Sequence, residues 1–63
     1  MESVYLISGQ NLRVLAEKGI VTVFESGYDP IRFAGRIRAT RGSSIGSELR
    51  TTRIQLEGQL IEG

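Results

Sequence analysis

The sequence predicts an all-β fold of about five strands, either a small curled antiparallel sheet or an SH3/Sm-like small barrel. Three observations support this prediction. Short stretches rich in valine, isoleucine and threonine alternate apolar with polar residues at a period of two. Clusters of glycine, serine and asparagine separate these stretches, as turns do. The 63 residues suffice for a single small β domain, which we place at residues 1-63.

The N-terminal part of the chain predicts a first strand at residues 4–7, where four consecutive residues favour β structure. Both faces of this strand would be partly covered, because apolar side chains point to each side. Residues 8–11 read Ser-Gly-Gln-Asn and have the composition of a turn. We therefore expect the first strand to end at residue 7.

Residues 11–18 fit two structures. As a helix, the segment would start at an N-cap Asn11 and end before Gly19. As a strand, Leu12 and Val14 would share a face, and residues 17–19 would form a hairpin loop with Gly19 at a positive φ. The segment is short for a helix and contains a β-branched residue, so the strand is favoured while the helix stays open.

Residues 20–25 form the clearest predicted strand, because apolar and β-branched residues occupy both of its faces. A turn follows over residues 26–30. Pro30 lacks an N–H and disfavours the helical region for Asp29, so a regular ladder can restart only at Ile31.

From residue 31 the alternation separates an apolar face from a basic one. The inward set is expected to be Ile31, Phe33, Ile37 and Ala39. The outward set is expected to be Arg32, Arg36 and Arg38. Gly35 lies between them and predicts a bulge or a bend that would redirect the basic row.

The C-terminal part predicts a loop at residues 41–47, which hold two glycines and three serines, and then a bent strand or two short strands over residues 49–61. The segments IRFAGRI and IQLEGQL share one pattern, with Gly35 and Gly58 at the same place in it. This likeness favours two strands that curve at the same height in one barrel.

Charge is distributed unevenly along the chain. Residues 32–53 contain six arginines and only one acidic residue, Glu48, whereas the segments on both sides are mildly acidic. Arginine presents a planar set of donors that fits phosphates and stacks on bases. The sequence therefore predicts a small nucleic-acid-binding regulatory protein, with Tyr28, exposed at the tip of a loop, as an additional contact. The predicted binding residues are Arg32, Arg36, Arg38, Arg41, Arg50, Arg53 and Tyr28.

Three other interpretations of these residues stay open. The arginines could form a solvated outer face that pairs with Glu48 and Glu57. They could also belong to a protein–protein interaction module or a self-assembling structural subunit, in which they meet acidic groups on a partner. Tyr28 could instead cover one end of the barrel.

The composition excludes several kinds of chemistry. The chain has no cysteine and no histidine, so disulfides, thiolate metal sites and histidine bases are ruled out. We expect no enzyme activity, no cofactor, no bound metal and no small-molecule substrate. No apolar stretch is long enough for a membrane helix, and Glu2 is unsuited to a signal peptide, so a cytoplasmic location is expected. Because so short a chain buries a marginal core, we also expect a homo-oligomer.

A strand, a turn and a second strand with a late glycine, which together make up about a third of the chain, resemble part of the ring-forming small barrels that bind RNA. The turn at residues 26–30 is longer than in that family, and the family's second motif is missing. No functional residues are carried over from the resemblance.

Overall fold

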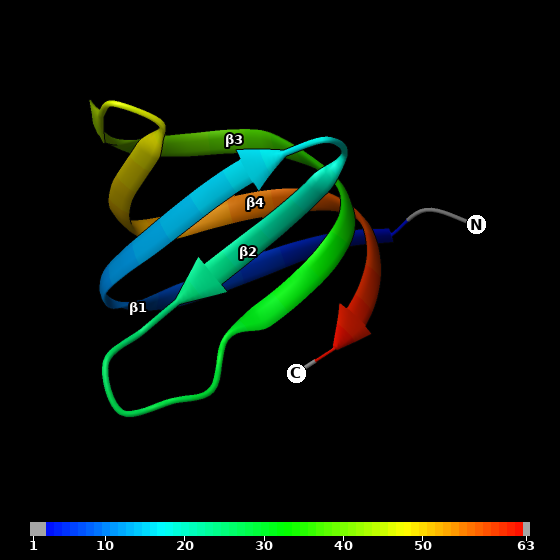
Figure 1. The fold of residues 1–63 in the computed structure, drawn as a ribbon, viewed down its shortest axis with the longest axis horizontal. Helices are drawn as coiled ribbons and strands as arrows, with labels where there is room; N and C mark the ends of the chain where they lie inside the picture. Colours follow the sequence, from blue (N-terminus) through cyan, green and yellow to red (C-terminus); the bar gives the residue numbers. More distant parts are fainter. Residues whose placement is uncertain (1–2, 63) are drawn as a thin grey trace.

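The computed structural model describes residues 3–62, which form four antiparallel strands and no helix. The strands are β1 (Ser3–Glu17), β2 (Ile20–Phe24), β3 (Ile31–Ile45) and β4 (Glu48–Glu62). Each strand pairs with two others, so that the order β1-β2-β3-β4 closes on itself as a ring (Figure 1). The all-β prediction is confirmed, but the ring has four strands where about five were expected. None of these residues form a helix that is long and apolar enough to cross a membrane.

β1 continues through the segment that was expected to be a turn. Its ladder with β4 shifts register between Ser8 and Leu12, and Asn11 within the shift has a φ of 54°. The prediction of a turn at residues 8–11 is therefore wrong: these turn-forming residues make a bulge inside a strand. The segment after the bulge is a strand and not a helix, because Leu12 and Val14 both point into the core.

The hairpin between β1 and β2 matches the strand alternative for this segment. Lys18 and Gly19 form its two-residue turn with φ values of 52° and 77°. Positive φ at both central residues is the geometry that fits the twist of antiparallel strands. The Gly19 carbonyl also accepts a hydrogen bond of 2.9 Å from the Gly35 N–H of β3.

The predicted loop at residues 41–47 is wrong for most of its length. β3 runs on to Ile45, and only Gly46 and Ser47 form the turn before β4. Gly42 pairs with Thr51 of β4, so the glycine- and serine-rich composition is accommodated in a ladder that contains register shifts. The composition of this segment is typical of a loop. Composition alone, however, carries no information on whether the backbone groups pair with a neighbouring strand.

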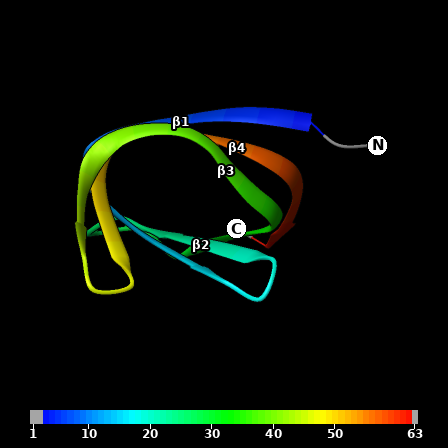
Figure 2. The same cartoon turned by 90° about the horizontal axis from the view of Figure 1, so that it is seen from above.

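β3 passes from one side of the ring to the other along a strong curve (Figure 2). At the curve Gly35 of β3 lies directly opposite Gly58 of β4. The expectation that these two glycines sit at the same height is confirmed.

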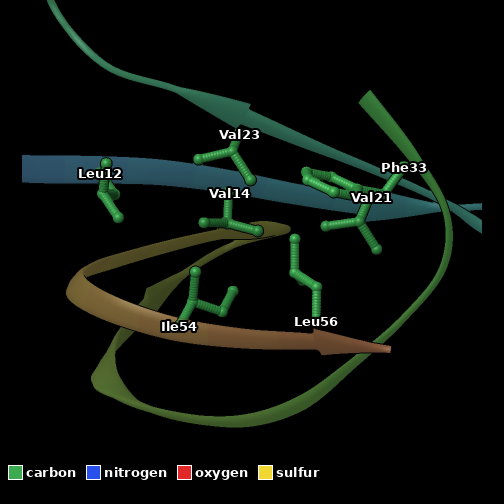
Figure 3. Packing of buried hydrophobic residues seen from close by; sticks show 7 residues of the cluster. All are labelled: Leu12, Val14, Val21, Val23, Phe33, Ile54 and Leu56. Atoms are coloured by element: carbon green, nitrogen blue, oxygen red, sulfur yellow. The ribbon is translucent and has the colours of Figure 1, made fainter. Parts of the chain in front are cut away.

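The core lies inside the ring and draws on all four strands (Figure 3). The ring of Tyr5 packs against the ring of Phe33, with centroids 5.2 Å apart. Ile31 and Ile37 are half-buried against this core, as expected, but Ala39 is exposed. The ladder skips one β3 residue between Ile37 and Ala39, so the alternation shifts by one position there. The buried apolar residues are Leu12, Val14, Val21, Val23, Phe33, Ile54 and Leu56.

Candidate nucleic-acid interface

The outer surface of β1, β4 and β3 carries most of the positive charge. β4 lies between the other two strands, and residues directly opposite one another in these ladders point to the same side. Ile54 and Leu56 of β4 point into the core, which places Arg53, Gln55 and Glu57 on the outside. We call the cationic part of this surface the arginine face; its residues are Arg13, Arg36, Arg38, Arg41, Arg50 and Arg53.

One end of the arginine face holds Arg36 and Arg38 of β3. Arg36 lies opposite Glu57, and the Arg36 Nη2 atom is 3.3 Å from the Glu57 Oε1 atom. Arg38 is exposed, and it is the residue that the β3–β4 ladder skips. Across β4, Val4 of β1 lies opposite Glu57 and is 50% exposed. This end therefore combines two guanidinium groups, one carboxylate and one exposed apolar side chain.

The middle of the arginine face is held by a buried threonine. The Thr51 side chain is buried on the inner side of the sheet. Its hydroxyl lies within hydrogen-bonding distance of two acceptors, the backbone carbonyl of Arg41 and, at 2.8 Å, the backbone carbonyl of Arg53. The same oxygen accepts a hydrogen bond of 3.2 Å from the Arg53 N–H. Thr40 also donates to the Arg53 carbonyl at 3.2 Å. These bonds fix the backbone at the register shifts from which Arg41 and Arg53 project.

The other end is an ion cluster around Glu48. Its carboxylate accepts from Arg13 at 2.9 Å and lies 3.2 Å from the Arg50 Nε atom. The hydrogen bond from Arg13 is the main reason that the pKa of Glu48 is lowered. The guanidinium of Arg13 also lies 5.4 Å from the centre of the Phe24 ring. Glu48 thus aligns two arginines from different strands.

Tyr28 belongs to the connection between β2 and β3 and is 74% exposed. Its N–H donates to the Glu25 carbonyl at 3.1 Å, which closes a turn. The side chain lines a hollow of about 460 Å³ together with Arg13 and Arg50. Tyr28 therefore stands beside the Glu48 end of the arginine face, and its ring also borders an apolar hollow at the end of the ring-like sheet.

The structure separates Arg32 from the other predicted residues. Arg32 lies before the curve at Gly35, opposite Thr22 of β2 and Glu62 of β4. The single row Arg32, Arg36 and Arg38 expected from the alternation is thus divided between two sides of the ring. The five other predicted arginines share the arginine face, and Tyr28 lies at its margin.

Sequence reasoning did not include Arg13 among the binding residues. The signal was present in the strand alternative for residues 11–18, in which Arg13 alternates with the inward residues Leu12 and Val14. The pairing of Arg13 with Arg50, far along the chain, could be seen only in the ladder.

Two further observations complete the description. Among the side chains that the structure describes, no three acidic groups lie close enough together to hold a metal ion. No family model, curated protein or solved structure matches this chain.

Proposed function

We propose that this chain is a small nucleic-acid-binding regulatory protein that contacts phosphates through the arginine face. One observation carries the proposal: six arginines from three strands converge on one surface, and the described side chains there include only two carboxylates, Glu48 and Glu57. Clustered guanidinium groups neutralise phosphates and release their counterions, which favours binding to nucleic acid. The proposed activity is binding without catalysis, in the cytoplasm.

Whether the arginines are already paired with carboxylates of the same chain distinguishes a phosphate-binding surface from one that is only solvated. Arg13, Arg36 and Arg50 are engaged by carboxylates of the same chain. Within residues 3–62, Arg38, Arg41 and Arg53 make no ion pair with a described carboxylate. Three guanidinium groups are therefore ready for external phosphates, and the ion pairs hold the remaining three in place beside them.

Oligonucleotide binding at two salt concentrations tests the proposal. We expect mixed DNA or RNA oligonucleotides to bind at low salt, with a fall of roughly 0.7–0.9 log units in affinity per log unit of salt for each phosphate contacted. Replacing Arg41 and Arg53 by glutamine should weaken binding and reduce the salt slope by about 1–2. Arg32→Gln is the matched control, because the curve at Gly35 separates Arg32 from the arginine face. Absence of binding at low salt would refute the proposal.

We also propose that the ring-like sheet is a small barrel of the SH3/Sm-like kind. Its support is the closed order of the four strands, together with the sharp curve at the paired glycines. Barrels of this size present outer faces and loops to nucleic acids.

The second candidate function is self-assembly into a homo-oligomer. One observation favours it: residues 3–8 of β1 pair only with β4 among the described strands, and none of these six residues is charged. Edge strands without charges or proline are prone to pair with another chain. Sedimentation equilibrium tests this candidate, with Val4→Lys as the variant that should dissociate the oligomer. A monomer at tens of micromolar would contradict it.

A further inference from the structure

The arginine face contains two adjacent hollows between β1 and β3. The first has a volume of about 670 Å³ and the second about 350 Å³. Lining the first are Val4, Arg36, Ile37, Arg38 and Glu57. The second is lined chiefly by Leu6, Ala39, Arg41, Arg53 and Gln55.

The two hollows share two features, although a carboxylate, Glu57, lines only the first of them. Each has one exposed apolar side chain from β1, which is Val4 in the first and Leu6 in the second. Each also has two arginines. In the first hollow both come from β3, whereas in the second hollow Arg41 comes from β3 and Arg53 from β4. Val4 is 50% exposed and Leu6 is 56% exposed, so the core does not account for either side chain. Apolar groups that stay exposed beside paired cations form a surface suited to a ligand with a flat apolar part and an anionic part.

The spacing of the hollows follows from the strand. Val4 and Leu6 lie two residues apart on one face of β1, a separation of about 6.7 Å. This distance is within the reach of neighbouring nucleotides in an extended single strand. In a duplex, by contrast, the base faces are stacked on one another and cannot reach such side chains.

We infer that the arginine face binds single-stranded nucleic acid, with one nucleotide in each hollow. Each base would lie against Val4 or Leu6, and its phosphate would lie on the neighbouring pair of arginines. The arginine planes can also stack on bases, which suits a surface with few aromatic residues. Gln55 offers an amide donor and an acceptor to a base edge in the second hollow. This inference rests on the proposed function and narrows it to unpaired strands.

Fluorescence anisotropy with labelled oligonucleotides of about 12 nucleotides tests the inference, because single-strand site sizes fall in this range. The probes are oligo-dT, oligo-rU and a DNA duplex of the same length, all at one low salt concentration. We expect either single strand to bind at least about tenfold more tightly than the duplex. The preference between oligo-dT and oligo-rU identifies whether DNA or RNA is the better ligand.

The variant Leu6→Ser separates base contacts from phosphate contacts, because it removes an apolar wall and leaves every charge in place. Single-strand affinity should fall about five- to tenfold, while the weak duplex affinity stays unchanged. Ile61→Ser is the matched control, since Ile61 is also exposed but lies outside both hollows. Circular dichroism melting of each variant verifies that the fold is retained.

Failure of the inference and failure of the proposed function give different results. Equal or tighter duplex binding overturns the inference and leaves phosphate binding intact. The inference is also overturned if Leu6→Ser binds single strands and duplex with the same affinities as the parent protein, or if the two affinities fall by the same factor. If neither single strands nor duplex bind at low salt, the proposed function itself is wrong, and the inference falls with it.

Discussion

Gly35 and Gly58 face each other across the β3–β4 ladder with their backbones in contact. A Cβ on Gly35 would lie 2.7 Å from the Gly58 Cα, and a Cβ on Gly58 would lie 2.8 Å from the Gly35 Cα. Each would also meet a carbonyl oxygen of the opposite strand, Glu57 or Ala34. The φ values of 157° and 153° are rare for residues with a side chain. This contact lets two long strands curve together, so that one end of the arginine face lies beside the curve.

Alanine at Gly35 should therefore destabilise the fold. Strain in the backbone and displacement of β4 together predict a loss of about 2–4 kcal/mol in the free energy of unfolding. Urea denaturation followed by circular dichroism measures this loss. Gly27→Ala is the control, because Gly27 has a positive φ but nothing within 4 Å of an added Cβ, and should lose only about 1–2 kcal/mol. Equal losses in the two variants would show that the close contact is unimportant.

Thr51 should be needed for both stability and binding. Thr51→Val keeps the shape of the side chain but leaves the Arg41 carbonyl and the Arg53 N–H without their hydroxyl partner, whereas the Arg53 carbonyl keeps Thr40. We expect a loss of about 1–3 kcal/mol in the free energy of unfolding, together with weaker oligonucleotide binding. Thr51→Ser retains the hydroxyl and should lose less of both. A Thr51→Val protein as stable as the parent would argue against this role.

The pKa of Glu48 should depend on Arg13. Because the Arg13 hydrogen bond holds this pKa below its ordinary value, Arg13→Gln should raise it, as carboxyl NMR titration can measure. The stabilising contribution of Glu48 is present above the unfolded-state pKa, about 4.3, and is lost as pH falls through the lower folded-state pKa. Glu48→Gln should lack this acidic dependence of stability. An unchanged Glu48 pKa in Arg13→Gln would exclude the hydrogen bond as its cause.

Glu25 should stabilise the bulge in β1. Its Oε2 atom accepts a hydrogen bond of 2.8 Å from the Gln10 N–H, and a Cβ at Gly9 would collide with the same carboxylate. Glu25→Ala should accelerate hydrogen exchange at the Gln10 amide and lower the free energy of unfolding by about 1 kcal/mol. Glu25→Gln keeps an acceptor and should show a smaller effect. Unaltered exchange at Gln10 in Glu25→Ala would mean that the bond is not formed in solution.

Much of the fold followed from local pattern. Alternation over residues 31–37 placed Phe33 inside and Arg36 outside, because a strand in a one-sided sheet repeats every two residues. The turn at Lys18 and Gly19 was recognisable, since a two-residue hairpin needs positive φ values that glycine adopts easily. The matched glycines in two segments likewise indicated a shared curve.

Pairing partners decided the rest. Residues 8–11 and 41–47 have the composition of turns and loops, yet they continue strands because β4 offers hydrogen-bond partners along both. The register shifts in these ladders move individual side chains between faces, and a period-of-two pattern cannot locate such shifts. They expose Ala39, place Arg38 at a skipped position and bring Arg41 beside Arg53.

The candidate site divides in the same way. Five of its six arginines and one of its two carboxylates, Glu48, lie within residues 32–53, where the sequence alone shows that positive charge is concentrated. Which arginines meet was decided by tertiary structure: the curve at Gly35 removes Arg32 from the row, and the β1–β4 ladder adds Arg13 beside Arg50. The physical reason is that local sequence sets the direction of a side chain relative to its own strand, whereas only the closure of the ring sets which strands lie side by side.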